Sequence, residues 1–229
     1  MTLAACVLSF LAASPAALGP VPAGVVRVYL VRHGQAVSNL EPKPNLPPDQ
    51  LDRLTDLGRE QARRAGGALR GGGVVLVLSS PAGRARETAE EIRAALGAPP
   101  VRLEPRLRPL DLGRGPGGKA LTWDDRGLEW KAGRDTVPEG GESMEQMGQR
   151  VLDLVRAEAR ERPGKSVVLV THGEVIGAFV GLVERITPAK RYPPTARNGS
   201  VTVVEAGPAT PPVLLLSDFV AAESEAAKP

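Results

Sequence analysis

The chain contains two histidines, and both occupy the same local sequence context. His33 lies in Arg32-His33-Gly34 and His172 in Thr171-His172-Gly173, so each follows a short apolar run and precedes a glycine. Short apolar runs rich in valine predict buried strands. Because the carboxyl ends of parallel strands line the ligand crevice of an open α/β sheet, the two histidines can meet at one site. A lone histidine is more often a core residue, but two in one context favour a shared chemical role.

A metal site and a disulfide framework are poor explanations of this pattern. Two histidines without a cysteine or an evident third ligand beside them make a weak zinc site, and the single cysteine of the chain excludes disulfides and a cysteine-built metal centre. We therefore predict no metal and no other cofactor.

The basic residues suggest phosphate rather than nucleic acid as a partner. Lys and Arg number 29 against 26 Asp and Glu, and arginine is far commoner than lysine. The planar guanidinium grips phosphate bidentately. Aromatic residues form only 3% of the chain, too few for the stacking platforms of nucleic-acid binding modules. The excess of arginine therefore suits phosphate binding, and we expect no nucleic-acid partner.

Residues 1–24 resemble a secretory leader. No charged side chain precedes Arg27, and the segment from Leu3 to Leu18 is apolar or small. This run is too short for a stable membrane span of about 20 residues, and Ser14-Pro15-Ala16 and Val21-Pro22-Ala23 are candidate cleavage sites. We expect an exported protein, periplasmic or secreted, rather than a cytoplasmic one. The alternative is a disordered extension or a misassigned start.

The remainder of the chain predicts a three-layer α/β domain over residues 25–218, followed by a tail at 219–229. Prolines make 42–48 a loop, and 105–142 is too rich in glycine, proline and charge for regular elements to be assigned. Elsewhere, strands alternate with helices, which predicts a mainly parallel sheet with helices on both faces. The expected strands are 25–31, 74–78, 101–104, 167–170, 200–204 and 213–216, and the expected helices are 55–70, 83–96, 143–160 and 174–184.

The segment Arg32-His33-Gly34-Gln35-Ala36-Val37-Ser38-Asn39 resembles the signature of the histidine phosphatase superfamily, the phosphoglycerate mutase-like proteins. Five further segments resemble family segments in the same order, and together they cover about residues 25–218. They are Leu54-Thr55-Asp56-Leu57-Gly58 with Gln61-Ala62, Ser79-Ser80-Pro81 through Arg84-Ala85-Arg86-Glu87-Thr88-Ala89, 138–143, 168–173 and Asn198-Gly199-Ser200.

The resemblance implies a phosphoryl-transfer site. His33 is then the nucleophile that becomes phosphohistidine, and His172 stabilises the transferring phosphoryl group. Arg32 and Arg84 supply positive forks for its oxygens, which such a reaction needs more than bond-making power. A covalent intermediate divides one hard step into two easier ones.

Three other expectations concern the surroundings of these groups. Gly34 would let the backbone approach the phosphate closely, and Asn39 would donate a hydrogen bond to it. Family members usually carry a glutamate after the third strand that protonates the leaving oxygen, but Pro109 occupies that position and cannot donate a proton. Asp111 is the first candidate replacement and Glu174 the second, because a general acid must lie within hydrogen-bond reach of the leaving oxygen.

The sequence therefore predicts a metal-independent phosphatase that hydrolyses a small phosphomonoester through a phosphohistidine. A phosphoglycerate mutase-like phosphomutase is the nearest alternative, although the chain shows no long lid insertion that would shield the intermediate from water. A non-catalytic phosphate-binding protein is the other alternative, and the presence of Arg32, His33, Arg84 and His172 together speaks against it.

Overall fold

A six-stranded sheet organises the computed structural model, which describes residues 15–186 and 196–221. The strand order is β3-β2-β4-β1-β5-β6. The first four of these are mutually parallel, whereas β5 is antiparallel to both of its neighbours. The strands are β1 (Val26–Arg32), β2 (Val74–Ser79), β3 (Arg102–Leu103), β4 (Ser166–Thr171), β5 (Val201–Ala206) and β6 (Val213–Phe219).

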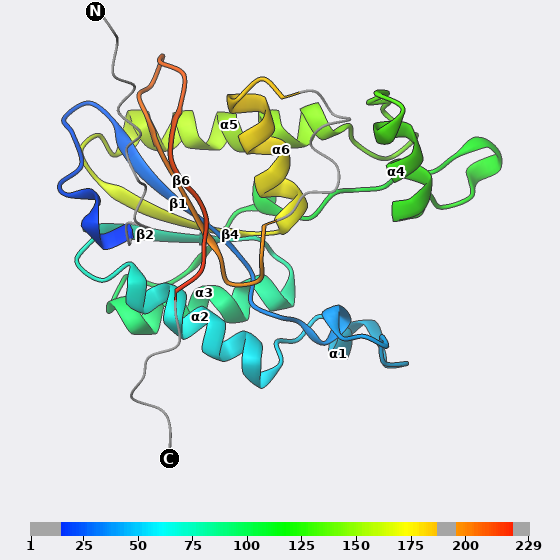
Figure 1. The fold of residues 1–229 in the computed structure, drawn as a ribbon, viewed down its shortest axis with the longest axis horizontal. Coiled ribbons are helices and arrows are strands. Elements are labelled where there is room, and N and C mark those ends of the chain that lie inside the picture. Colours follow the sequence, from blue (N-terminus) through cyan, green and yellow to red (C-terminus); the bar gives the residue numbers. More distant parts are fainter. Residues whose placement is uncertain (1–14, 187–195, 222–229) are drawn as a thin grey trace, which may run out of the picture.

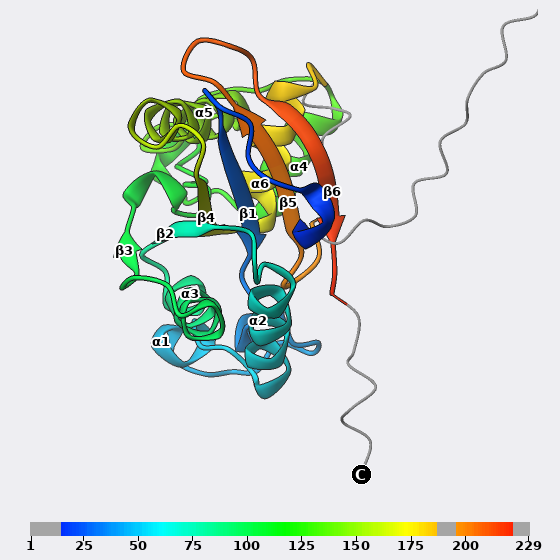
Figure 2. The same ribbon diagram turned by 90° about the vertical axis from the view of Figure 1, so that its left-hand side faces the viewer.

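Helices cover both faces of this sheet (Figures 1 and 2). On one face lie α2 (Asp56–Ala68) and α3 (Gly83–Leu96), and on the other lie α5 (Met144–Glu161) and α6 (Gly173–Val183). Alternate residues of β1 enter two separate cores: Val28 and Leu30 pack with α5 and α6, and Tyr29 and Val31 pack with α2 and α3. A strand buried on both faces reads as a nearly continuous apolar run, and residues 25–31 form one that only Arg27 interrupts. The predicted three-layer, mainly parallel α/β fold is confirmed.

Local capping chemistry sets the helix ends that the sequence predicted. The Thr55 side chain accepts from the Gly58 amide at 3.0 Å and begins α2. Gly97, with a φ of 62°, ends α3 in the left-handed conformation that glycine tolerates. Ser143 and Gln146 form a reciprocal capping box at the start of α5.

Two parts of the chain are more regular than predicted. Pro48 begins a short helix, α1 (Pro48–Leu51), because proline fits the first turn of a helix, where its missing N–H is not needed. The 105–142 segment contains α4 (Trp123–Lys131), which projects from the body of the molecule in Figure 1. The signal for α4 is the capping box of Thr122 with Asp125, which the surrounding glycines obscured.

Short 3₁₀ turns complete the fold at Pro15–Leu18, Val37–Asn39, Pro105–Leu107 and Pro116–Gly118. The segment that follows the first of these turns is held against the sheet by Arg27 of β1. The buried Arg27 side chain pairs with Glu205 at 2.5 Å. The same guanidinium donates to the carbonyls of Leu18 and Gly19, which ties this part of the expected leader to the sheet. Within 15–186 and 196–221, no helix is both long enough and apolar enough to span a membrane.

Candidate active site

The side chains singled out in the sequence meet beyond the carboxyl ends of β1, β2 and β4. Arg32 ends β1, His33 follows it, and His172 follows β4 as the N-cap residue of α6. Arg84 is the second residue of α3, the helix after β2. Because β1 and β4 are parallel neighbours with Arg32 opposite Thr171, the two histidines emerge side by side. Their ring centroids are 5.2 Å apart.

Hydrogen-bond partners fix the tautomers of both rings. His33 Nδ1 is 2.8 Å from the Gly34 carbonyl, which only accepts, so Nδ1 carries the proton and Nε2 carries an unprotonated lone pair. Arg84 Nε donates to that lone pair at 3.1 Å. His172 Nδ1 accepts from Arg84 Nη2 at 3.0 Å, so His172 Nε2 donates to Ser80 Oγ at 2.9 Å. Two imidazole lone pairs therefore converge on one guanidinium.

The surroundings keep both histidines neutral. Burial, followed by the positive charge of Arg84, lowers the pKa of His33 from 6.5 to about 3. Burial, His33 and Arg84 lower the pKa of His172 well below 6.5. An imidazole held neutral near pH 7 has an unprotonated nitrogen available as a nucleophile.

Two arginines supply positive charge around the imidazoles. Arg84 faces both rings and also donates from Nη1 to Asp52 Oδ1 at 2.5 Å. Arg32 donates from Nη1 to the Ala196 carbonyl, while its buried Nε has no hydrogen-bond partner in the described part of the chain. A Cβ on Gly173 would lie 3.2 Å from that Nε, so the glycine leaves room for the guanidinium. Both forks suit the oxygens of a phosphoryl group.

Gly34 is required by packing against another glycine. A Cβ at Gly34 would overlap the carbonyl oxygen of Gly58, and a Cβ at Gly58 would overlap the carbonyl oxygen of Gln35. The Gly34 amide donates to Thr88 Oγ1 at 3.0 Å. This close approach joins the loop after β1 to the start of α2 and holds the residue next to His33 in place.

Asn39 uses its side-chain oxygen within the protein. Its Oδ1 accepts from the Ala36 amide at 3.0 Å and from Asn198 Nδ2 at 3.4 Å. Asn198 also donates to the His33 carbonyl at 3.0 Å. The Asn198-Gly199-Ser200 segment therefore supports the backbone of His33.

Asp111, the first candidate acid, lies on the surface. Its side chain is exposed, and Oδ1 accepts from the Gly113 amide at 3.1 Å. The loop that carries it is held by Arg150, which donates to the carbonyl of Pro109 at 3.4 Å and to both carboxylate oxygens of buried Glu142 at 2.9 and 3.0 Å. Among the described residues, Asp111 makes no hydrogen bond or ion pair with either histidine or with Arg32 and Arg84, and it lacks the burial that raises the pKa of Glu174.

Glu174, the second candidate, is the carboxyl group that faces the site. It lies in the first turn of α6, two residues after His172. Burial raises the pKa of its carboxyl above 4.5, although its own N–H, Arg84, Arg32 and the N–H of Leu110 favour the charged form. A buried carboxyl with a raised pKa, close enough to Arg84 and Arg32 to be affected by their charges, is suited to hold a proton for general-acid chemistry.

Sequence reasoning missed two polar partners of the site. Ser80 entered the sequence analysis only as part of the Ser79-Ser80-Pro81 segment, yet its Oγ accepts a hydrogen bond from His172 Nε2. Asp52 precedes the recognised Leu54-Thr55 segment, and nothing in its local sequence distinguishes it from a surface carboxylate. Its contact with Arg84 exists only in the tertiary structure.

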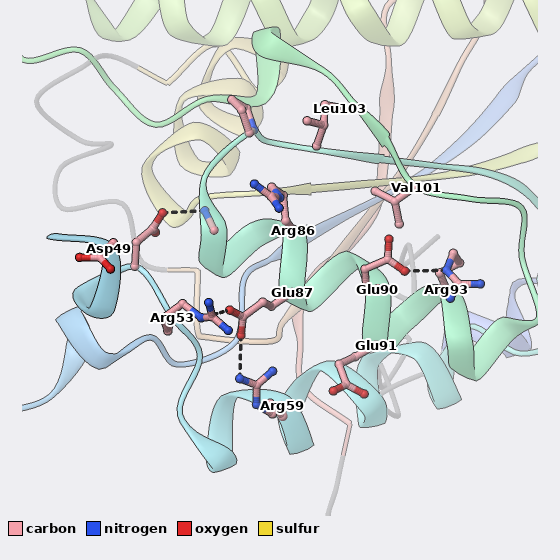
Figure 3. Close-up of a pocket in the computed structure, with 13 residues that line it drawn as sticks. Asp49, Arg53, Arg59, Arg86, Glu87, Glu90, Glu91, Arg93, Val101 and Leu103 are labelled. Atoms are coloured by element: carbon pink, nitrogen blue, oxygen red, sulfur yellow. Dashed lines mark hydrogen bonds and ion pairs between the residues drawn. The ribbon is translucent and has the colours of Figure 1, made fainter.

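A separate hollow lies on the outer side of α3 (Figure 3). Its charges largely pair with one another: Glu87 accepts from Arg53 at 2.5 Å and from Arg59 at 2.9 Å, and Arg93 pairs with Glu90 at 2.7 Å. This hollow is not lined by either histidine, by Arg32 or by Arg84. Across the described ranges, no group of three or more His, Cys, Asp or Glu side chains is arranged to hold a metal ion.

A family model, the histidine phosphatase superfamily (branch 1), matches residues 28–218. The chain belongs to the histidine phosphatase superfamily. The motif order predicted this family correctly, and family membership supports phosphatase or mutase catalysis.

Individual relatives differ in their activity. The probable phosphoglycerate mutase GpmB of Erwinia tasmaniensis is 32% identical over 186 residues, which cover 79% of this chain and 85% of the relative. A mycobacterial glucosyl-3-phosphoglycerate phosphatase, solved with VO3, is 29% identical with a TM-score of 0.66, covering 84% of this chain and 98% of that one. YhfR of Bacillus stearothermophilus is 27% identical with a TM-score of 0.68, covering 85% of this chain and 98% of that structure.

Proposed function

We propose that this superfamily member is a phosphatase that hydrolyses a small phosphomonoester through a phosphohistidine on His33. The observation that carries the proposal is the Nε2 lone pair of His33, which is unprotonated, buried and 3.1 Å from Arg84 Nε. An anionic phosphoryl group placed between His33 and the two arginines would meet a nucleophile and positive charge together.

In the first step, His33 Nε2 attacks phosphorus and the bond to the leaving oxygen breaks. Glu174, in its protonated form, gives its proton to that oxygen. The bond from His33 Nδ1 to the Gly34 carbonyl supports the positive charge that develops on the imidazole. The negative phosphoryl group opposes the effects that lower the pKa of His172. His172 therefore takes up a proton from solvent on Nδ1 when the substrate binds, donates a hydrogen bond to a phosphoryl oxygen, and returns the proton to solvent when orthophosphate leaves.

In the second step, water attacks phosphorus and the bond to His33 breaks. The Glu174 carboxylate accepts the proton of that water, which returns the acid to its starting form. Orthophosphate leaves and the imidazole is regenerated. No step requires a metal ion, and we propose that the enzyme acts without one.

The test is hydrolysis of nitrophenyl phosphate by the purified protein and by His33→Ala. The proposal expects turnover by the native chain and none above background by the variant. Unchanged activity in His33→Ala would remove the mechanism. Absence of turnover by both proteins on every phosphomonoester in a metabolite panel would favour the non-catalytic alternative.

The mutase alternative is kept because the curated relatives are named as probable phosphoglycerate mutases. The name of the mycobacterial phosphatase also contains a 3-phosphoglycerate group. Incubation with 3-phosphoglycerate separates the two activities, because a phosphatase releases orthophosphate whereas a mutase forms an isomer and leaves total ester phosphate unchanged. We propose orthophosphate release as the main outcome.

Export is the second part of the proposal. If the leader is cleaved after Ala16, the contacts from Arg27 to the carbonyls of Leu18 and Gly19 survive, whereas cleavage after Ala23 removes them. We therefore favour the earlier site. Cell fractionation and sequencing of the mature N-terminus test this, and an intact Met1 in a cytosolic fraction would contradict export.

A further inference from the structure

The catalytic arginine is held by a carboxylate from a different part of the chain. Asp52 is the residue that ends α1, between His33 and α2 in the sequence. Its Oδ2 accepts from the Gly83 amide at 2.6 Å, and its Oδ1 accepts from Arg84 Nη1 at 2.5 Å. The Arg84 amide is a longer 3.5 Å from Oδ1.

The start of α3 explains why this carboxylate matters. The N-cap residue of α3 is Ala82, which has no side-chain acceptor for the first amides of the helix. Asp52 supplies that acceptor from another segment, and its negative charge suits the positive end of the helix dipole. One carboxylate thus caps the helix and grips the side chain of its second residue.

This grip determines which edges of the guanidinium face the active site. With Nη1 bound to Asp52, the remaining donors Nε and Nη2 face His33 Nε2 at 3.1 Å and His172 Nδ1 at 3.0 Å. A guanidinium is a rigid planar fork, so fixing one nitrogen restricts the directions of the others. The flexible stem of Arg84 would otherwise allow many orientations.

We propose that Asp52 is a positioning residue that aims Arg84 at the transferring phosphoryl group. The inference rests on the proposed function, since it concerns the same site. Among the described residues, Asp52 makes no hydrogen bond to either histidine and acts through Arg84. The competing explanation is that Asp52 only caps α3 and affects activity through folding.

A double-mutant cycle separates these two roles. Asp52→Asn keeps the shape of the side chain but removes its charge and one of its two acceptor atoms. In the native background we expect kcat on nitrophenyl phosphate to fall about tenfold and KM to rise about threefold, because Arg84 contacts the phosphoryl oxygens in the bound substrate and more strongly in the transition state. In an Arg84→Ala background, the same substitution should change kcat/KM less than about twofold.

Thermal unfolding provides the readout for the capping role. A lost cap should lower the melting temperature by a similar amount in both backgrounds, whereas the effect on kcat should depend on Arg84. A kcat loss of the same size in both backgrounds would overturn the proposal and leave only a structural cap. An unchanged kcat in Asp52→Asn would overturn it as well.

Asp49→Asn is the matched control. Asp49 is the acidic residue of the first turn of α1, is exposed, and its side chain makes no hydrogen bond or ion pair within the described part of the chain. It lies at the edge of the hollow beside α3 (Figure 3). This variant should keep native kcat and melting temperature.

The affinity for orthophosphate, measured by calorimetry, gives a second test that requires neither turnover nor the double variant. Asp52→Asn should weaken orthophosphate binding at least threefold relative to the native protein and to Asp49→Asn, because Arg84 is no longer aimed. Native affinity in Asp52→Asn would overturn the proposal. Full hydrolysis by His33→Ala would instead refute the proposed mechanism, and this result is distinct from either outcome for Asp52.

Discussion

Acidification from pH 7 to pH 5 should destabilise the protein through its buried histidines. In the folded chain the pKa of His33 is about 3, whereas the unfolded chain has the ordinary value of 6.5. Between these values the unfolded state binds a proton that the folded state does not. The stabilising contribution of neutral His33 is therefore complete above pH 6.5 and is lost as the pH falls toward 3.

The size of this loss follows from the difference in pKa. Each unit corresponds to about 1.4 kcal/mol, so at pH 5, roughly 1.5 units below the unfolded-state pKa, His33 should cost about 2 kcal/mol. His172, whose pKa is also lowered by burial, adds a loss of the same sign. Glu174 acts in the opposite direction, because a carboxyl with a raised pKa favours the folded state as the pH falls.

Urea unfolding of the native chain and of His33→Asn isolates the contribution of His33. The variant removes the His33 ionisation, whereas the other groups that titrate in this interval, including His172 and Glu174, are present in both proteins. We expect the free energy of unfolding of the native chain to fall about 2 kcal/mol more between pH 7 and pH 5 than that of the variant. Equal losses in the two proteins would refute the conclusion that burial keeps His33 unprotonated.

Three further predictions concern the acid, the glycine pair and metals. Glu174→Gln should lower kcat on an alkyl phosphate by about 10²-fold or more, and far less on nitrophenyl phosphate, whose leaving group needs no proton; Asp111→Asn should leave both rates within about twofold, and equal effects of the two variants would reject Glu174. Gly34→Ala should destabilise by on the order of 1–3 kcal/mol in thermal unfolding, because its methyl group would meet the Gly58 carbonyl. Gly67→Ala, in open space on α2, should be neutral or stabilise by up to about 1 kcal/mol, and a similar loss in both would contradict the packing argument. A chelator should leave the phosphatase rate unchanged, whereas loss of activity restored by a divalent cation would exclude a metal-free mechanism.

The positions of the principal site residues could be predicted because each depends on local sequence. Valine-rich runs before His33 and His172 identified two parallel strands, and the sheet topology then required their ends to meet. Arg84 could be placed from the motif after β2. The cap residues Thr55 and Ser143 also report local hydrogen bonds, so the starts of α2 and α5 were predictable.

The remaining features depend on contacts that sequence patterns do not encode. Asp111 was preferred as the acid because it is close to Pro109 in the chain, but its loop turns it toward solvent. Glu174 lies beside the site because it is in the first turn of α6, whose N-cap residue is His172. The Leu110 amide, which is distant in sequence, also bonds to its carboxyl group. Asp52 likewise reaches Arg84 across 32 residues of sequence.

Direct detection of the covalent intermediate tests the central claim most sharply. The native protein is mixed with nitrophenyl phosphate, quenched within milliseconds in alkaline denaturant, and analysed by peptide mass spectrometry. The account predicts one phosphoryl group on His33, stable to alkali, lost in acid and absent from His33→Ala. Rapid turnover with no phosphorylated His33, or with the phosphoryl group on another residue such as Ser80, would contradict it.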